Sequence, residues 1–472
     1  MARVEFVDRS DELAALDDVW AGRAAQLFVL WGRRRVGKTE LLNRVAADRR
    51  SLYFEATNIT QAEQLLDLSA ELARVSGNAL LAQQPLTSWE AALTAIKQFV
   101  GDERTIVILD EFQFLAAQEA GIGSIVNRWW RSTGRHLPIV LVLAGSEVGF
   151  FEREVLGGEM YGRRTGQLQI LPLRYRDAAL FHPGYAPEDR IRAYAICGGM
   201  PYYLERFTDD TPLEEHILRH TLYRDGFLFQ EADLLLRQEL PDPRNHVSVL
   251  RAIAQGQTQN NQVAARTQLS ASQVTQIVAT LERMQLVRTL RPVTAPQRSK
   301  KSVYEIRDGF LSYYFRFVDP ARSRLRTRAQ AEAYLAEVVL PQLDRFVSKG
   351  AWEQIAQDYV LEKEHAAAVG SWWGQVPTGE GRKTRSQEID IVAVDHSGAV
   401  TATGSCKWTT TKLSRSEDHL LTATEPHIPR AGAVRRHYFF SRAGFAEDLT
   451  RLAAADGDRY RLVTPADVYG SR

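Results

Sequence analysis

The chain has 472 residues, of which 44% are hydrophobic and 25% charged, so it is expected to fold into about three domains rather than remain disordered. Lys and Arg total 59 and Asp and Glu total 58, and the net charge of +1 excludes binding of nucleic acid through overall charge. The two cysteines, Cys197 and Cys406, argue against a disulfide scaffold, and without an apolar stretch of signal-peptide or membrane-span length we expect a cytoplasmic protein with no membrane partner.

Apolar runs alternate with helical patterns over residues 1–172, which is the signature of βαβ units and a parallel sheet. The runs that read as strands are Gln26–Trp31, Ser51–Ala56, Thr105–Leu109, Ile139–Ala144 and Gln167–Leu171. The pattern turns helical over residues 173–240, and two nearby prolines, Pro241 and Pro243, then indicate a linker. We therefore expect an α/β domain followed by a helical region.

A glycine-rich segment follows the first predicted strand. Its residues are Gly32, Arg33, Arg34, Arg35, Val36, Gly37, Lys38 and Thr39, which fit the phosphate-loop pattern of P-loop NTPases. The glycines permit the tight turn that points backbone N–H groups at phosphates, and the helix that starts near Lys38 and includes Glu40 adds its positive N-terminal end. Lys38 is expected to contact the β and γ phosphates of ATP, and Thr39 to ligate Mg²⁺.

Two carboxylates end the predicted strand at residues 105–109. Asp110 is expected to hold Mg²⁺, and Glu111 to orient the water that attacks the γ-phosphate. Another apolar run, Pro138–Ala144, is followed closely by Ser146, which is expected to sense the γ-phosphate. In a parallel sheet these strand ends meet at one edge, so the sequence predicts an ATPase site there.

These segments resemble the archaeal-type ATPases, a branch of the AAA+ and STAND class. The matching segments are Phe6–Arg9, the phosphate loop, Leu109–Gln113 and Cys197–Tyr203. The resemblance implies that the segment with Val7 and Arg9 packs against adenine, and that Pro201 belongs to a helical lid near the nucleotide. It also implies an arginine finger at Arg163 or Arg164, although a solvated or salt-bridged loop explains these arginines equally well.

Residues 244–310 read as a winged helix. Apolar residues recur at helical spacing between Ser272 and Met284, and Val287–Val293 and Ser302–Ile306 read as wing strands. In a DNA-binding winged helix the long helix enters the major groove, and basic wing residues contact phosphates. The candidate DNA contacts are Gln273, Gln276, Arg298, Lys300 and Lys301. The alternative, at similar odds, is a winged helix that packs on its own ATPase domain, as in STAND proteins.

Helical periodicity returns over Arg328–Val347, and strands are predicted at Ile389–Val394, Ala399–Lys407 and His437–Ser441. Residues 340–472 resemble the C-terminal domain of the same ATPase group, which is similar to PD-(D/E)xK nucleases. The resemblance assigns Glu353, Asp390 and Lys407 to a nuclease-like magnesium site. Ser405 stands where the second acid belongs, and Glu388, on the same face of its strand as Asp390, is the available substitute. We expect a degenerate site that does not cleave DNA.

Three functions follow from this organisation. The first is a switch or motor that hydrolyses ATP and engages DNA or a regulatory partner, either a protein or a second copy of the chain. The second is a signalling scaffold that binds ATP or ADP with little turnover, and the third is a DNA nuclease gated by ATP. Intact Glu111 favours hydrolysis, and Ser405 argues against cleavage.

Overall fold

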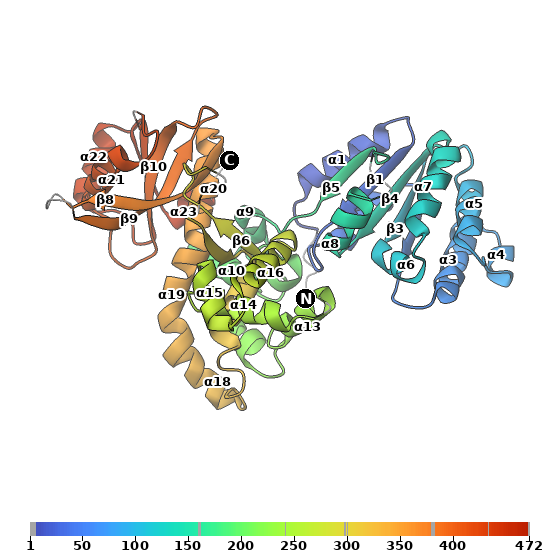
Figure 1. Ribbon diagram of the computed structural model, residues 1–472, viewed down its shortest axis with the longest axis horizontal. Coiled ribbons are helices and arrows are strands. Elements are labelled where there is room, and N and C mark those ends of the chain that lie inside the picture. The colour runs from blue at the N-terminus through green and yellow to red at the C-terminus, as the bar shows by residue number, and fades with distance from the viewer. Residues whose placement is uncertain are drawn as a thin grey trace. The chain divides into compact units, whose positions relative to one another are not determined.

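The computed structural model describes residues 6–158, 162–240, 242–296, 299, 301–378, 383–432 and 434–470. The chain forms two compact units, and each is described by itself below (Figure 1). The first runs to Pro172 and includes Met200–Tyr202, and the second comprises Leu173–Gly199 and the chain from Tyr203 onward. Two of the predicted DNA contacts, Arg298 and Lys300, lie outside the described residues.

The first unit is built on a parallel five-stranded sheet in the order β2-β3-β4-β1-β5. Its strands are β1 (Gln26–Trp31), β2 (Ser51–Glu55), β3 (Thr105–Asp110), β4 (Ile139–Gly145) and β5 (Gly166–Gln169). The longer helices that connect them are α1 (Ser10–Ala21), α2 (Lys38–Ala46), α3 (Gln61–Ser76), α5 (Trp89–Val100), α6 (Phe112–Gln118) and α7 (Ile122–Ser132). This is the predicted parallel sheet, with strand ends within two residues of those expected.

The core of this unit explains why its central strands read as unbroken apolar runs. Every residue of β3 and β4 is buried, because helices cover both faces of a parallel sheet. Leu27 and Val29 of β1 pack in the same cluster with Val107 and Leu109 of β3. Full burial of each such side chain stabilises the fold by about 1.5–3 kcal/mol, which fixes the sheet that carries the strand ends.

The second unit begins with helices that include α10 (Pro187–Cys197) and α13 (Glu231–Glu239). Three helices and an antiparallel hairpin follow, namely α14 (Arg244–Ala254), α15 (Asn260–Thr267), α16 (Ala271–Arg283), β6 (Val287–Leu290) and β7 (Val303–Ile306). Ser270 begins α16 with a capping box, and the buried face of α16 is Val274, Ile277, Val278 and Leu281. These are the helix and hairpin expected there, with the first wing strand shorter by three residues.

An aromatic segment follows the hairpin. It comprises α17 (Gly309–Tyr313) and the π-helical turn η5 (Tyr314–Val318), and its buried rings are Phe310, Tyr313, Tyr314, Phe315 and Phe317. A helical stretch then runs through α18 (Arg328–Tyr334), η6 (Leu335–Val339), α19 (Leu340–Val347) and η7 (Ser348–Trp352) into α20 (Glu353–Glu364). The helical periodicity over Arg328–Val347 is therefore confirmed.

The C-terminal part contains a mixed five-stranded sheet in the order β12-β11-β10-β9-β8. Its strands are β8 (Ala368–Pro377), β9 (Thr384–Val394), β10 (Val400–Lys407), β11 (Arg436–Ser441) and β12 (Tyr460–Val463). Strands β8, β9 and β10 pair antiparallel, whereas β10, β11 and β12 pair parallel. The helices beside it include α20, α21 (Ser416–Thr424) and α22 (Glu447–Ala455) (Figure 1). The sequence did not predict β8 and β12, the edge strands, because they lack a continuous apolar run.

His437 of β11 is fully buried and faces the helical segment that follows β10. Its Nδ1 is 2.7 Å from an Asp418 oxygen, and its Nε2 is 2.9 Å from an oxygen of Glu425. Burial lowers the pKa of His437, but the two carboxylates outweigh burial and raise that pKa above its ordinary value. The protonated ring is therefore stabilised by folding.

This arrangement predicts that the second unit loses stability as pH rises. A raised pKa in the folded state gives stability that is complete below the unfolded pKa and is lost as pH passes the folded pKa. Between pH 6 and pH 9 we expect the free energy of unfolding of the wild type to fall more steeply than that of His437→Gln. Urea unfolding followed by tryptophan fluorescence measures this, and equal pH slopes for both proteins would contradict it.

Among the described residues, no helix combines the length and apolar character needed to cross a membrane.

Candidate functional site

The predicted phosphate loop connects the end of β1 to the start of α2, and the sheet order places it beside the end of β4, with the end of β3 next in line. Arg35 and Gly37 have positive φ angles of 68° and 93°, so the loop turns tightly. Gly32 is packed so closely that an added Cβ would lie 2.4 Å from the carbonyl oxygen of Ile170. Lys38 is buried, and its Nζ donates to the carbonyl oxygens of Gly32 at 2.9 Å and Arg33 at 3.1 Å. The ammonium group is thus held on the loop.

The predicted metal ligands lie next to each other. The hydroxyl of Thr39 donates to the fully buried Asp110 at 3.4 Å, and Tyr53 of β2 donates to the same carboxylate oxygen at 2.6 Å. Burial and the Asp110 charge raise the pKa of Tyr53, so the phenol stays protonated and remains a donor. Burial, followed by the charges of Asp110 and Glu111, also raises the pKa of Glu55. The Asp110 carboxylate beside the Thr39 hydroxyl fits a magnesium ion.

Glu111 is held by a polar cluster at the neighbouring strand end. It takes up a left-handed conformation with φ of 52° immediately after Asp110. Ser146, which follows β4, donates to a Glu111 carboxylate oxygen at 2.7 Å, and the amide of Gln113 donates to Glu111 and, at 3.2 Å, to Ser146. Gly145 leaves room for this amide, because an added Cβ would lie 2.2 Å from the Gln113 oxygen. The predicted catalytic acid and the predicted sensor are therefore in direct contact.

Several residues that the resemblance assigned to the nucleotide lie around this loop. Arg9 is buried and donates to the carbonyl oxygens of Val36 and Leu171, both at 2.8 Å, so it fixes the loop from outside. Val7 is half-buried. Pro201 lies close to the loop, since its Cγ is 3.7 Å from the position that a Cβ on Gly37 would occupy.

The remaining loop side chains have diverse surroundings. The guanidinium of Arg34 lies 5.9 Å from the ring centre of Phe114, and that of Arg35 lies 4.7 Å from the ring centre of Tyr202. Arg33 is buried, whereas Thr39 and Glu40 are exposed.

The two candidate finger arginines lie elsewhere in the first unit. Arg163 is exposed, and Arg164 donates to the carbonyl oxygen of Leu156 at 3.2 Å. Both precede β5, in which Gly166 pairs with Phe28 of β1. The arginines therefore belong to the amino end of the sheet, whereas the phosphate loop follows the carboxyl end of β1. Within one chain the structure does not bring them to the loop.

The predicted DNA contacts that are described lie on α16 and beside the hairpin. Gln273 and Gln276 are exposed on α16, and the side chain of Gln273 accepts the backbone N–H of Ser270 at 2.9 Å as part of the helix cap. Lys301 is exposed, and the hairpin residue Arg288 forms an ion pair with Glu305. Part of the basic hairpin is therefore neutralised by the hairpin itself.

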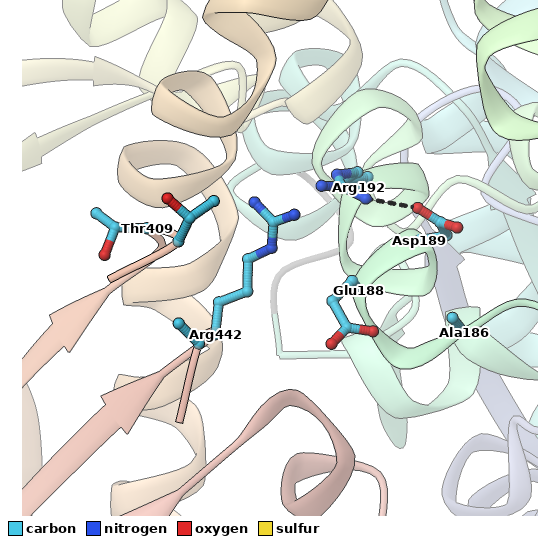
Figure 2. Close-up of a pocket in the computed structure, with 8 residues that line it drawn as sticks. Ala186, Glu188, Asp189, Arg192, Thr409 and Arg442 are labelled. Atoms are coloured by element: carbon cyan, nitrogen blue, oxygen red, sulfur yellow. Dashed lines mark hydrogen bonds and ion pairs between the residues drawn. The ribbon is translucent and has the colours of Figure 1, made fainter. Parts of the chain in front are cut away.

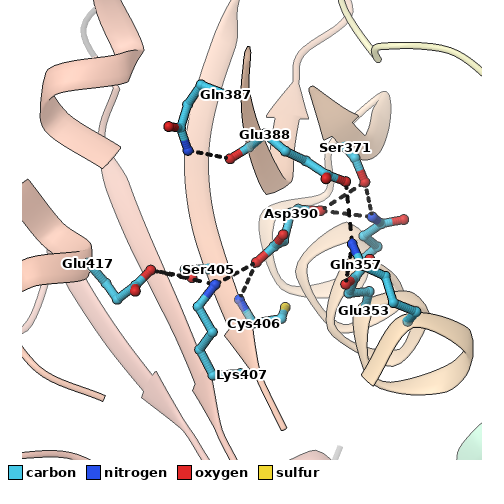
Figure 3. A network of polar contacts seen from close by, with 11 residues as sticks. Glu353, Gln357, Ser371, Gln387, Glu388, Asp390, Ser405, Cys406, Lys407 and Glu417 are labelled. Carbon is cyan, nitrogen blue, oxygen red and sulfur yellow. Dashed lines mark hydrogen bonds and ion pairs between the residues drawn. The ribbon is translucent and has the colours of Figure 1, made fainter. Parts of the chain in front are cut away.

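The predicted nuclease-like residues converge beside β9 and β10, two inner strands of the C-terminal sheet (Figure 3). Carboxylate oxygens of Glu353 on α20 and of Glu388 and Asp390 on β9 lie within 4.8 Å of one another. Lys407, at the end of β10, has its Nζ 3.6 Å from Asp390. Burial and the Asp390 charge raise the pKa of Glu353 to about 8, although Lys349 partly offsets them. Such crowded carboxylates fit a divalent cation.

The structure also contributes two residues that the sequence did not single out. Glu417 of α21 accepts a hydrogen bond from Ser405 at 2.8 Å and lies 3.7 Å from the Lys407 Nζ. Lys349 lies 3.3 Å from Glu353 and 3.7 Å from Glu388. A carboxylate therefore lies beside the serine that replaces the expected acid, but it comes from the following helix and not from the strand.

Different parts of the chain match different known families. Residues 6–207 match the model of a family described as an ATPase domain predominantly from Archaea. Residues 188–307 match a domain of unknown function, and residues 314–419 match a family of archaeal and bacterial proteins of unknown function. The N-terminal part of the chain is thus similar to the ATPase domains of that family.

Individual relatives and a solved structure are also similar to this chain. An uncharacterized protein of Methanocaldococcus jannaschii is 25% identical over 412 residues, which cover 85% of this chain and 87% of that protein. An uncharacterized ATP-binding protein of the same organism is 49% identical over 41 residues, or 9% of this chain and 70% of that protein. A Walker-type ATPase of Pyrococcus abyssi has 19% identity and a TM-score of 0.52, covering 66% of this chain and 97% of that one. The last likeness shows the P-loop ATPase fold.

Proposed function

We propose that this chain hydrolyses ATP and acts as a switch or motor of the AAA+ and STAND type. The observation that carries the proposal is a set of side chains at the carboxyl ends of three adjacent strands: Lys38 after β1, Asp110 and Glu111 at the end of β3, and Ser146 after β4. Glu111 is held by Ser146 from the neighbouring strand end, which is where a residue must lie to report the state of the γ-phosphate.

The side chains divide the work of this reaction. The loop N–H groups and Lys38 bind the phosphates, and Glu111 orients and deprotonates the attacking water. Thr39 and Asp110 would hold the magnesium ion, which, when bound, neutralises charge on the phosphates. Tyr53 keeps the Asp110 carboxylate in place for that role. Arg163 or Arg164 would act as a finger only from a second copy of the chain, because both lie at the opposite end of their own sheet.

The competing function is a scaffold that binds ATP or ADP with little turnover, and phosphate release distinguishes the two. Purified protein is incubated with ATP and Mg²⁺, alone and with duplex DNA, and free phosphate is measured against a Lys38→Ala preparation made in the same way. Release by the wild type at least about tenfold above that background supports hydrolysis, since typical enzyme turnover is far faster than uncatalysed cleavage. ATP binding without release under every condition would establish the scaffold.

The second candidate function is metal-dependent cleavage of DNA by a PD-(D/E)xK-like C-terminal domain. The convergence of Glu353, Glu388 and Asp390 beside Lys407 favours it, and Ser405 counts against it. The residues present fit a divalent cation, because three carboxylates supply hard oxygen ligands and a lysine stands beside them. We propose that this domain binds the metal without cleaving DNA. The metal would serve either to bind DNA or to stabilise the domain.

This proposal predicts metal binding that depends on Asp390. We expect Mn²⁺ to bind the wild type, and Asp390→Ala to weaken that binding at least about tenfold, because one of few carboxylate ligands is lost. Binding is measured by calorimetry on nucleotide-free protein. The matched control is Asp395→Ala, which removes a carboxylate outside the cluster. Supercoiled DNA with Mg²⁺ or Mn²⁺ should remain intact. Nicking by the wild type that disappears in Asp390→Ala would instead make nuclease activity the function of this domain.

A further inference from the structure

A hollow of about 590 Å³ on the first unit lies along α7 and the short 3-10 turn after it, η1 (Gly134–His136). It is lined by Ser124, Asn127, Arg128, Arg131, Ser132 and Arg135. The three arginines are exposed and follow one another at intervals of three and four residues. The hollow has neither an apolar residue nor a carboxylate in its lining.

The amphipathic character of α7 explains this arrangement. Ile122, Val126 and Trp130 recur every four residues and are buried in the core of the first unit. The helix is thereby anchored with its polar face outward, and residues one turn apart on that face are neighbours. Arg128 and Arg131 are thus held side by side on a rigid element and not on a mobile loop.

These arginines differ from the arginines of the first unit that form ion pairs, namely Arg9, Arg49, Arg50 and Arg74. Among the residues that the structure describes, no carboxylate forms an ion pair with Arg128, Arg131 or Arg135, whereas Arg49 pairs with Asp17 and Arg74 with Glu71. Unpaired like charges that lie next to each other repel, and an anion relieves that repulsion. The chain has nearly equal numbers of acidic and basic residues, so a cluster of positive charges without neighbouring carboxylates requires an explanation.

A second hollow, in the other unit, gives the contrasting case (Figure 2). Its volume is about 400 Å³, and its two arginines are Arg192 and Arg442. Arg192 pairs with Asp189 at 2.8 Å and with Asp344 at 3.0 Å, and Arg442 pairs with the same Asp344. Glu188 also lines that hollow, so its charges are internally balanced. The α7 hollow has no such balance.

We propose that the arginine face of α7 binds the sugar–phosphate backbone of a nucleic acid. Arginine, serine and asparagine are the side chains that usually contact phosphate oxygens, and the guanidinium fork matches phosphate geometry. Nucleic-acid interfaces are polar and positively charged, whereas protein interfaces depend on buried aromatic or aliphatic anchors, which this lining lacks. The surface therefore favours a nucleic acid over an acidic protein, and it is separate from the winged-helix hairpin.

The test measures binding of fluorescent duplex DNA, single-stranded DNA and single-stranded RNA to the full chain by anisotropy at several salt concentrations. Arg128→Glu combined with Arg131→Glu should weaken binding at least about tenfold and reduce the salt slope by about two, because each lost phosphate contact removes about 0.9 from that slope. The control, Arg23→Glu combined with Arg44→Glu, changes the net charge equally at exposed positions of the same unit and should stay within about twofold of the wild type. Lys301→Glu measures separately how much the hairpin contributes to nucleic-acid binding.

Folding and specificity are checked in the same series. The ATP affinity of the variant that combines Arg128→Glu and Arg131→Glu should equal that of the wild type. If it does not, the milder variant that combines Arg128→Gln and Arg131→Gln replaces it. Poly-glutamate should compete at least about tenfold less well than DNA at equal charge concentration, since it lacks phosphate geometry. Three results would each overturn the proposal: unchanged DNA affinity in the variants of Arg128 and Arg131, no binding by the wild type at low salt, or equal competition by poly-glutamate.

Discussion

Lys38→Ala is expected to lower the affinity for ATP at least about 100-fold, which corresponds to about 2.7 kcal/mol. The lysine is buried, and its ammonium is held on the loop by two carbonyl oxygens, so it is already ordered before a phosphate arrives. Charge-assisted hydrogen bonds to phosphate are among the strongest that proteins form, and truncation of one partner leaves the other charge uncompensated. The measurement is calorimetric titration of ATP with Mg²⁺.

The control is Lys97→Ala, because Lys97 is an exposed lysine on α5 of the same unit. It should bind ATP as the wild type does, and thermal melting of both variants should show that the fold is intact. Equal affinity of Lys38→Ala and wild type would remove the nucleotide assignment, and with it the proposed function.

The sequence predicts the sheet of this unit well because its strands are short, apolar and separated by helices. Unbroken apolar runs such as β3 and β4 occur only where both faces of a sheet are covered. The phosphate loop has a spacing that is specific by itself. What a linear pattern does not give is the order β2-β3-β4-β1-β5, on which the proximity of Asp110, Glu111 and Ser146 depends.

The residues that sequence reasoning missed are those whose role comes from that order. Tyr53 lies within β2 and reaches Asp110 only because β2 is the neighbour of β3. Gln113 belongs to the segment Leu109–Gln113 that resembles the ATPase family, but only the structure shows that it joins Glu111 to Ser146. In the C-terminal domain, Glu417 and Lys349 come from helices with no spacing relation to Asp390. Contacts of this kind have no local signature.

The sheet order also limits the role expected of Arg163 and Arg164. A resemblance can assign a role to residues by their place in the chain, but β5 runs parallel to β1, and both arginines precede it. Their own sheet therefore separates them from the phosphate loop. An arginine finger supplied by a second copy of the chain is consistent with this geometry. On that hypothesis, hydrolysis depends on assembly of the two copies.

Glu111→Gln is expected to retain ATP affinity within about threefold while lowering phosphate release at least about 100-fold, the size of effect usual for loss of a positioned general base. Glutamine keeps the size of the side chain and its ability to accept the Ser146 hydroxyl, which is 2.7 Å away in the wild type. It cannot take a proton from water, so binding and hydrolysis should separate.

The matched control is Glu55→Gln, because Glu55 ends the neighbouring strand and shares the field of Asp110 and Glu111. It should release phosphate within about threefold of the wild type, since removal of a nearby negative charge changes the site electrostatics without removing the base. Ser146→Ala should fall between the two, because Glu111 loses one of its two anchors and keeps Gln113. If Glu111→Gln hydrolyses ATP at the wild-type rate, the water must be activated by another group. The cluster of Ser146 and Gln113 would then hold Glu111 for a structural reason alone.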